Sequence, residues 1–118
     1  MEWTPIFYTD RNGKSPVKDF ILAQTDKTIA EILHTLKLLR IFHINLEMPF
    51  SKKITPELRE LRIKHGTDYY RILYCAVPEQ QFLLLHGILK KTDKLDKGDI
   101  VIAEKRLTDY QNRLADID

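Results

Sequence analysis

The sequence predicts a single α+β domain, an antiparallel sheet with helices on one face and a C-terminal helix. Three strand-like segments follow one another between residues 58 and 91 with short turns between them, and such successive strands pair in antiparallel fashion. Helical patterns of apolar residues lie before and after these strands. The 118 residues are enough for one modest core, so residues 1–118 are expected to be one domain.

The N-terminal segment predicts a short strand followed by a short helix. Residues 4–9, "TPIFYT", have the aromatic and β-branched content of a strand, and "DRNGKS" after them is typical of a turn. Ser15 and Pro16 fit an N-cap and a first helical position. This helix is expected to run to about Ala23.

A second helix is expected from Thr25 or Asp26 to about Leu46. Its apolar residues recur at intervals of three and four, the spacing of a stripe that faces a core. The segment "MPFSKKITP" after it is predicted to be a loop. The stripe consists of Ile29, Ile32, Leu33, Leu36, Leu39 and Phe42.

The second half predicts three strands and a last helix. The strands cover roughly residues 58–65, 69–77 and 81–91, with turns at "HGTD" and "PEQQ". Gly66 can supply the positive φ that the first turn needs. Asp96 is the expected N-cap of the final helix. The inner face of that helix is predicted to contain Ile100, Ala103, Leu107, Tyr110 and Leu114.

The turns also predict which residues face each other. A two-residue turn at Gly66-Thr67 places Arg62 opposite Arg71 and Lys64 opposite Tyr69. A turn at Glu79-Gln80 would add two residues of the third strand to the same face, although a one-residue slip would bury His86 and bring in Lys91 instead of Lys90. The face away from the helices is then expected to collect Arg62, Lys64, Tyr69, Arg71, His86 and Lys90.

The charge distribution supports a site on this face. Residues 52–94 contain nine basic and five acidic side chains, a balance of +4, whereas the segments before and after them contribute 0 and −2 to the total of +2. Like charges that face each other destabilise a sheet, so the Arg62–Arg71 pair suggests a polyanionic ligand. The alternative is a solvated strand edge protected by lysines.

The chemistry that fits such a face is metal-independent cleavage of RNA. Arginine and lysine can bind a phosphodiester, and the RNA supplies its own 2′-hydroxyl as nucleophile. Crowding of cations is expected to lower the pKa of a lysine, which could then act as base. The sequence contains no metal-binding motif, glycine-rich phosphate loop or G-x-S-x-G element, so neither a metal nor a cofactor is expected.

Other features bear on the cellular location of the protein and on the roles of its cysteine and histidines. The sequence contains no run of 18 apolar residues, and Cys75 is the one cysteine. Neither a transmembrane helix nor a signal peptide is therefore expected, which favours a cytoplasmic protein. Cys75 is expected to pack in the core. For His86 a structural role competes with a catalytic one, and His34, His43 and His65 have weaker claims.

Two stretches resemble a known family. "LRELRIKHGTDYYRILYC" and "LLLHGILKKTDKLDKGDIVIAEKRLTDY" are similar to the HigB-like, phage-associated branch of the RelE/ParE toxin superfamily, over about residues 56–110. This resemblance implies a RelE-like fold and a ribosome-dependent mRNA endonuclease (mRNA interferase), the toxin of a type II toxin–antitoxin pair. It also implies a helix-turn-helix antitoxin as partner, DNA contact only through that antitoxin, and mRNA in the ribosomal A site as substrate.

The resemblance carries over to particular residues. Arg62 and Lys64 match two basic residues before the Y-R motif, Arg71 matches the arginine that contacts the scissile phosphate, and Lys90 or Lys91 matches a later basic residue. The catalytic tyrosine of RelE has no equivalent, because Ile100 lies at that position. HigB toxins use histidines and an acid, so His86 or His65 could contribute. The expected catalytic residues are Arg62, Lys64, Arg71, His86 and Lys90, with Tyr69, Lys91 and Lys94 as RNA-binding residues.

Two other functions share this fold. A ParE-like toxin inhibits gyrase by binding it, without nuclease chemistry, and a degenerate toxin would only bind its antitoxin and regulate DNA. The basic face argues against the ParE-like function. If the nuclease assignment holds, Arg71→Ala is expected to abolish cleavage and leave the fold intact, because Arg71 is expected to be exposed.

Overall fold

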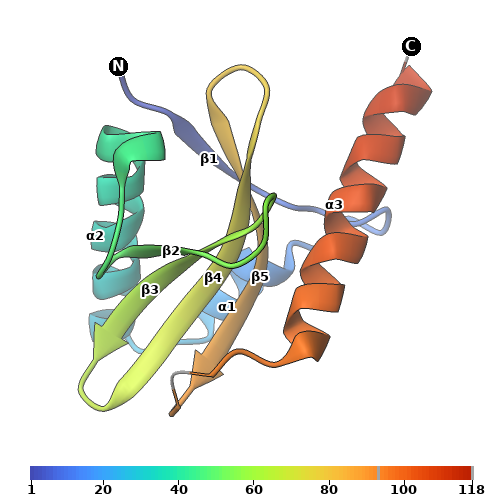
Figure 1. Ribbon diagram of the computed structural model, residues 1–118. Helices are drawn as coiled ribbons and strands as arrows, with labels where there is room; N and C mark the ends of the chain where they lie inside the picture. Colours follow the sequence, from blue (N-terminus) through green and yellow to red (C-terminus); the bar gives the residue numbers. More distant parts are fainter. Residues whose placement is uncertain (93, 118) are drawn as a thin grey trace.

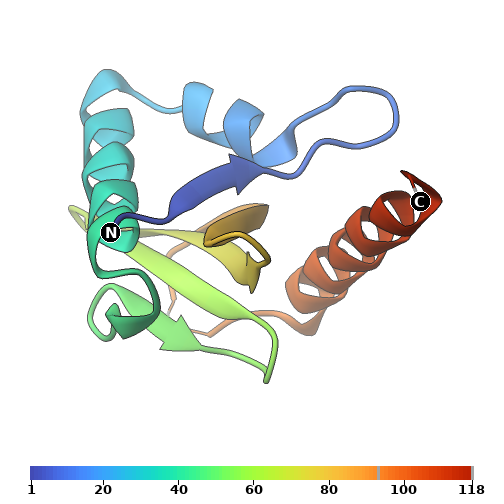
Figure 2. The same cartoon turned by 90° about the horizontal axis from the view of Figure 1, so that it is seen from above.

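The computed structural model describes residues 1–92 and 94–117. One sheet of five strands separates two helices on one side from a third helix on the other (Figures 1 and 2). The elements are β1 (Thr4–Phe7), α1 (Pro16–Leu22), α2 (Asp26–Phe42), a short 3-10 turn (His43–Asn45), β2 (Ser51–Lys53), β3 (Arg59–His65), β4 (Asp68–Val77), β5 (Gln81–Lys90) and α3 (Lys97–Ile117).

The predicted α+β class is confirmed, and the sheet itself is mixed. The strand order is β1-β5-β4-β3-β2. Strands β2 to β5 are antiparallel to their neighbours, as expected, whereas β1 pairs in parallel with β5. The chain reaches this arrangement because α1 and α2 connect β1 to the far edge of the sheet (Figure 1).

The helices cover both faces of the sheet, which corrects the expectation of one covered face. Residues of α1 and α2 such as Val17 and Ile32 pack against Leu61 and Ile72 in a first core. On the opposite face, α3 forms a second core with β4 and β5. The apolar stripe of an amphipathic helix predicts that the helix is buried but does not specify against which face.

The predicted end of α2 is wrong, whereas the predicted start of α3 is confirmed. The helix α2 ends at Phe42, four residues earlier than expected, because His43 has a φ of 41°, which a helix cannot contain. The carbonyl oxygen of Asp96 accepts the first hydrogen bonds of α3, as the predicted N-cap does. On α3, Ala103 and Leu107 are buried but Leu114 is 44% exposed.

The strand β2 lies in the segment predicted to be a loop. Ser51–Lys53 pairs with Arg59–Leu61, although two of its three residues are lysines and the third, Ser51, is buried. Its side chains therefore show neither the alternation nor the β-branched content that predicts a strand.

The register of the first hairpin is confirmed. Arg62 pairs with Arg71 and Lys64 with Tyr69, and Gly66 has the positive φ of 63° that the turn requires.

The register of the second hairpin changes along its length. Tyr69 pairs with Lys90 and Leu73 with His86, as predicted, but a bulge after Leu73 shifts the remaining pairs by one, so that Tyr74 faces Leu84. The predicted pairs next to the turn are therefore wrong. The bulge allows Leu84 to reach the first core and Leu85 to reach the second.

None of the helices in the described part of the chain is long and apolar enough to cross a membrane.

Candidate functional site

The β3–β4 hairpin brings four predicted site residues together on the face that α3 partly covers. Because side chains alternate along a strand, the confirmed register places Arg62, Lys64, Tyr69 and Arg71 on one side of the sheet. We call these four residues the basic cluster. Lys64 is exposed, Arg62 and Tyr69 are partly exposed, and Arg71 is buried.

A buried carboxylate offsets the repulsion between the two arginines. Glu60 precedes Arg62 by two residues on β3, so its side chain is on the same face, and it is 1% exposed. Its Oε1 lies 3.3 Å from Nη1 of Arg62 and its Oε2 lies 3.3 Å from Nη1 of Arg71. Burial raises the pKa of Glu60, and the two guanidinium groups act in the opposite direction. The carboxylate fixes both arginines in place.

The ring of Tyr69 lies among three cations. The guanidinium carbons of Arg62 and Arg71 are 5.9 Å and 5.8 Å from the ring centre, and Nζ of Lys64 is 5.7 Å from it. These distances are within the range of cation–π attraction. The tyrosine thus holds three positive groups around one point of the surface.

The expectation that Arg71 is exposed is wrong. Its side chain is 1% exposed and donates a 2.8 Å hydrogen bond to the carbonyl oxygen of Thr92, besides its contact with Glu60. The arginine therefore ties β4 to the segment after β5. The expectation that Arg71→Ala would leave the fold intact loses its basis, and the variant is instead expected to be destabilised, because removing one member of a buried ion pair is strongly destabilising.

His86 and Lys90 on β5 are held by α3. Nε2 of His86 is 2.9 Å from Oδ1 of Asp99, and its Nδ1 is 3.3 Å from Nη1 of Arg106. Since arginine can only donate, Nδ1 accepts and the proton is on Nε2, directed at Asp99. Both ring nitrogens are therefore engaged within the protein.

Lys90 is paired with two carboxylates of the segment that begins α3. Its Nζ contacts Asp96 and lies 3.5 Å from Asp99, and the hydrogen bond to Asp96 raises the pKa of Lys90. For this lysine the expected lowering of the pKa by neighbouring cations is therefore wrong.

The remaining predicted residues lie at the edge of this region. Lys91 and Lys94 are exposed in the connection between β5 and α3. His65 ends β3, opposite Asp68, and Ile100 is in the first turn of α3. In residues 1–92 and 94–117, no group of three or more His, Cys, Asp and Glu side chains is placed to hold a metal ion.

Sequence reasoning overlooked Glu60, Asp99 and Arg106. Glu60 could have been found, because the register that places Arg62 on the cationic face places Glu60 there as well. Asp99 and Arg106 could not, since their contacts depend on the face that α3 covers.

A comparison with protein families identifies the chain. Residues 19–108 match the model of the family described as phage derived protein Gp49-like (DUF891), and this range includes α2, the basic cluster and most of α3. A search of curated proteins found no match. The chain belongs to the Gp49-like family of phage-derived proteins, a toxin-like family within the RelE/HigB-like toxins.

Proposed function

We propose that this protein is the toxin of a type II toxin–antitoxin pair and that it cleaves mRNA on the ribosome without a metal ion. The observation that carries the proposal is the basic cluster, in which three cations surround Tyr69 on one sheet face. Membership of a toxin-like family supports a toxin, and the cationic surface favours an RNA substrate over a protein target.

The reaction uses the nucleophile of the substrate. The 2′-oxygen attacks the neighbouring phosphorus, the bond from phosphorus to the 5′-oxygen breaks, and a cyclic phosphate and a 5′-hydroxyl result. One proton leaves the 2′-hydroxyl and another is delivered to the 5′-oxygen. The protein must stabilise the negative charge that accumulates on the phosphoryl oxygens and must assist these two proton transfers.

The accessible residues of the cluster fit these tasks. We assign phosphate binding to Arg62, whose side chain is 11% exposed and is oriented by Glu60, and proton transfer to Lys64, which is exposed beside Tyr69. Arg71, buried behind them, sets the position of Glu60 and adds positive charge to the site. Lys90, through Asp96 and Asp99, and His86, through Asp99, position α3 beside the site. Tyr69, Lys91 and Lys94 contact RNA.

The proposed partners follow from this role. A toxin-like family suggests an antitoxin that neutralises the protein. We propose a helix-turn-helix antitoxin that also binds the operator DNA of the pair, and a cytoplasmic site of action, where translating ribosomes are found.

Primer extension on a reporter mRNA tests the proposal. In a purified translation system the protein is expected to produce in-frame cuts that require ribosomes. Lys64→Ala and Arg62→Ala are each expected to reduce the cleavage rate about 10²-fold, the typical effect of removing one group that stabilises transition-state charge. Lys64→Arg separates charge from proton transfer, since arginine keeps the charge but does not titrate.

A matched control is Lys37→Ala, which removes an exposed lysine from α2 and should leave cleavage unchanged. Full activity of both cluster variants would contradict the site. Absence of cuts together with inhibited gyrase supercoiling would assign the protein to the ParE-like class, and absence of both effects would leave an antitoxin-binding regulator.

A further inference from the structure

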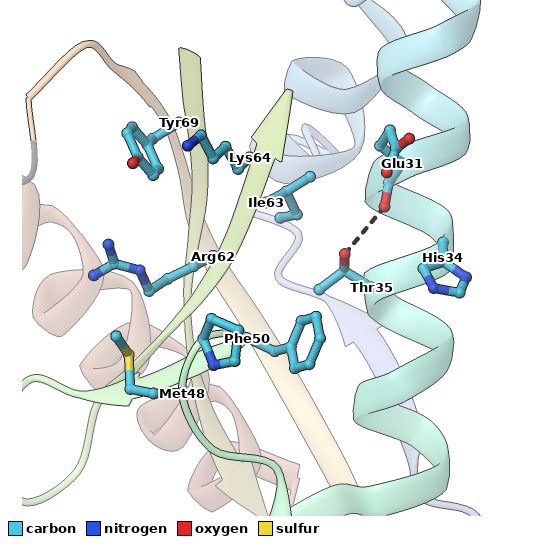
Figure 3. Close-up of a pocket in the computed structure, with 10 residues that line it drawn as sticks. Glu31, His34, Thr35, Met48, Phe50, Arg62, Ile63, Lys64 and Tyr69 are labelled. Carbon is cyan, nitrogen blue, oxygen red and sulfur yellow. Dashed lines mark hydrogen bonds between the residues drawn. The ribbon is translucent and has the colours of Figure 1, made fainter. Parts of the chain in front are cut away.

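A cavity of about 390 Å³ lies around the edge of the sheet from the basic cluster. Arg62, Lys64 and Tyr69 line it from the cluster side, and Glu31, His34 and Thr35 line it from α2. Figure 3 shows Arg62, Lys64 and Tyr69 on the side of β3 away from α2, whereas the ring of Phe50 lies between β3 and α2, so that the cavity passes around the edge of the strand. We call this space the α2–β3 cavity.

The cavity exists because β2 covers only part of β3. Strand pairing ends at Ser51 and Leu61, and the last backbone contact runs from the amide of Arg62 to the carbonyl oxygen of Phe50, at 2.8 Å. Among the described residues, no strand continues along β3 beyond that point. The same backbone contact fixes Phe50 at the entrance of the uncovered edge.

The walls of the cavity differ in chemistry. Phe50, Tyr69 and Ile63 provide aromatic and aliphatic surface, which suits a flat apolar ring. On the α2 side, the hydroxyl of Thr35 is occupied because it donates to the carbonyl oxygen of Glu31 at 3.1 Å. The carboxylate of Glu31, which is exposed, adds a hydrogen-bond acceptor and a negative charge that would repel a phosphate.

We propose that the α2–β3 cavity binds one base of the RNA whose phosphate lies on the basic cluster, and that Glu31 selects a base with an exocyclic amino group. The inference rests on the proposed nuclease function and adds a substrate preference to it. The ribose-phosphate chain stays on the cations of the cluster, and the base turns over the edge of β3 and stacks on Phe50. Glutamate accepts hydrogen bonds from amino groups such as that of cytosine, so adenine, cytosine and guanine bind better than uracil.

A peptide strand added to the uncovered edge of β3 is the competing occupant. The three cations around Tyr69 favour RNA over a peptide, because they bind the phosphate next to the base. The aromatic wall favours a base as well, since stacking on aromatic side chains is the common mode by which single-stranded RNA is held.

Binding of an RNA that cannot be cleaved tests the inference apart from catalysis. The probe is a fluorescein-labelled 2′-O-methyl tetranucleotide, which lacks the attacking hydroxyl, with each position in turn made abasic. By anisotropy, one abasic position is expected to weaken binding to the unchanged protein about tenfold. Phe50→Ala is expected to weaken binding of the intact probe by about the same factor. In this variant, removing the base at the sensitive position is expected to have almost no further effect on affinity.

Base identity provides the second readout. Uracil at the sensitive position is expected to bind several-fold more weakly than cytosine, and Glu31→Gln is expected to remove this difference. Leu33→Ala is the matched control, because Leu33 is 54% exposed on α2 and does not line the cavity; it should change none of these values.

The outcomes separate the inference from the proposed function. Equal losses at every abasic position, or no binding of the probe, would overturn the base-binding cavity, whatever primer extension shows. A Phe50→Ala variant that binds RNA normally but loses its antitoxin would assign the cavity to a peptide. If one probe position is sensitive to removal of its base but primer extension shows no cleavage on ribosomes, the base-binding cavity would be supported and the nuclease function would be contradicted.

Discussion

Glu60 explains at the scale of single residues how the fold tolerates two arginines that face each other. Arg62 and Arg71 are directly opposed across β3 and β4, and each has a nitrogen 3.3 Å from a different oxygen of the same buried carboxylate. A carboxylate between two guanidinium groups replaces part of their mutual repulsion by two attractive contacts.

The buried pair predicts that Arg71→Ala destabilises the protein by about 3–5 kcal/mol, because the buried carboxylate of Glu60 would lose one of its partners. Urea denaturation followed by circular dichroism measures the free energy of unfolding. The double variant Arg71→Met with Glu60→Leu is expected to recover most of the loss, since a buried pair replaced by apolar residues is often neutral. A change below about 0.5 kcal/mol for Arg71→Ala, the range of ordinary surface substitutions, would contradict the structural role.

At the scale of elements, α3 is held against the rest of the molecule at several points along its length. Near its beginning, Asp99 contacts His86. Farther along the helix, the hydroxyl of Tyr8 donates to Asp109 at 2.7 Å, and Arg113 donates to the carbonyl oxygen of Thr9. The segment after β1 and the helix α3 are thus joined by polar contacts in addition to the apolar packing of the second core, to which Tyr8 also belongs.

These contacts make the docking of α3 sensitive to acid. The hydrogen bond from Tyr8 lowers the pKa of Asp109, so the folded state favours the ionised carboxylate. This stabilisation is present above the unfolded pKa of about 3.9 and is lost as the pH falls through the lower folded pKa. Asp109→Asn is therefore expected to lower the urea midpoint at pH 7, and the difference from the unchanged protein should shrink at pH 3. Asp116→Asn, an exposed position on α3, is the control, and an equal loss at both pH values would contradict the account.

The elements also show what the sequence could predict. The turn at Gly66 fixes the β3–β4 register, and with it the four residues of the basic cluster. The bulge in β5 lies beside the run of leucines at residues 83–85; identical apolar side chains show no alternation, so nothing in the pattern marks the extra residue. The prediction that Lys90 lies on the same sheet face as the basic cluster is confirmed. Its pairing with Asp96 depends on the position of α3, which local sequence patterns do not specify.

At the scale of the whole molecule, β4 and β5 belong to both cores. Tyr74 and Leu84 pack in the first core, on the side of α1 and α2, whereas Cys75 and Leu85 pack in the second core, beneath α3. Strands buried on both faces read as continuous apolar runs, so the runs in β4 and β5 are a signal that both faces are covered. The sequence analysis used these runs to predict the strands but not to divide the helices between the two faces. If β4 and β5 unfolded, the apolar side chains of both cores would be exposed to water.

This sharing predicts that both cores unfold in a single transition, and the chain contains one natural probe for each. Trp3, the one tryptophan, packs 5.0 Å from Phe82 in the first core. Cys75, the one cysteine, is buried in the second core, and burial raises the pKa of its thiol to about 11, so that it should resist thiol reagents while the protein is folded.

In a urea titration, the fluorescence of Trp3 and the pulse-labelling of Cys75 by a disulfide reagent are expected to give the same midpoint, as two-state unfolding requires. Cys75→Ala supplies the labelling baseline, and its fluorescence is expected to show a single sigmoidal unfolding transition. Labelling of Cys75 at a urea concentration well below the fluorescence midpoint would show instead that α3 leaves the sheet first. In that case the contacts of Asp96 and Asp99 with Lys90 and His86 would open before the basic cluster loses its strands, because Arg62 and Arg71 are carried by β3 and β4 rather than by α3.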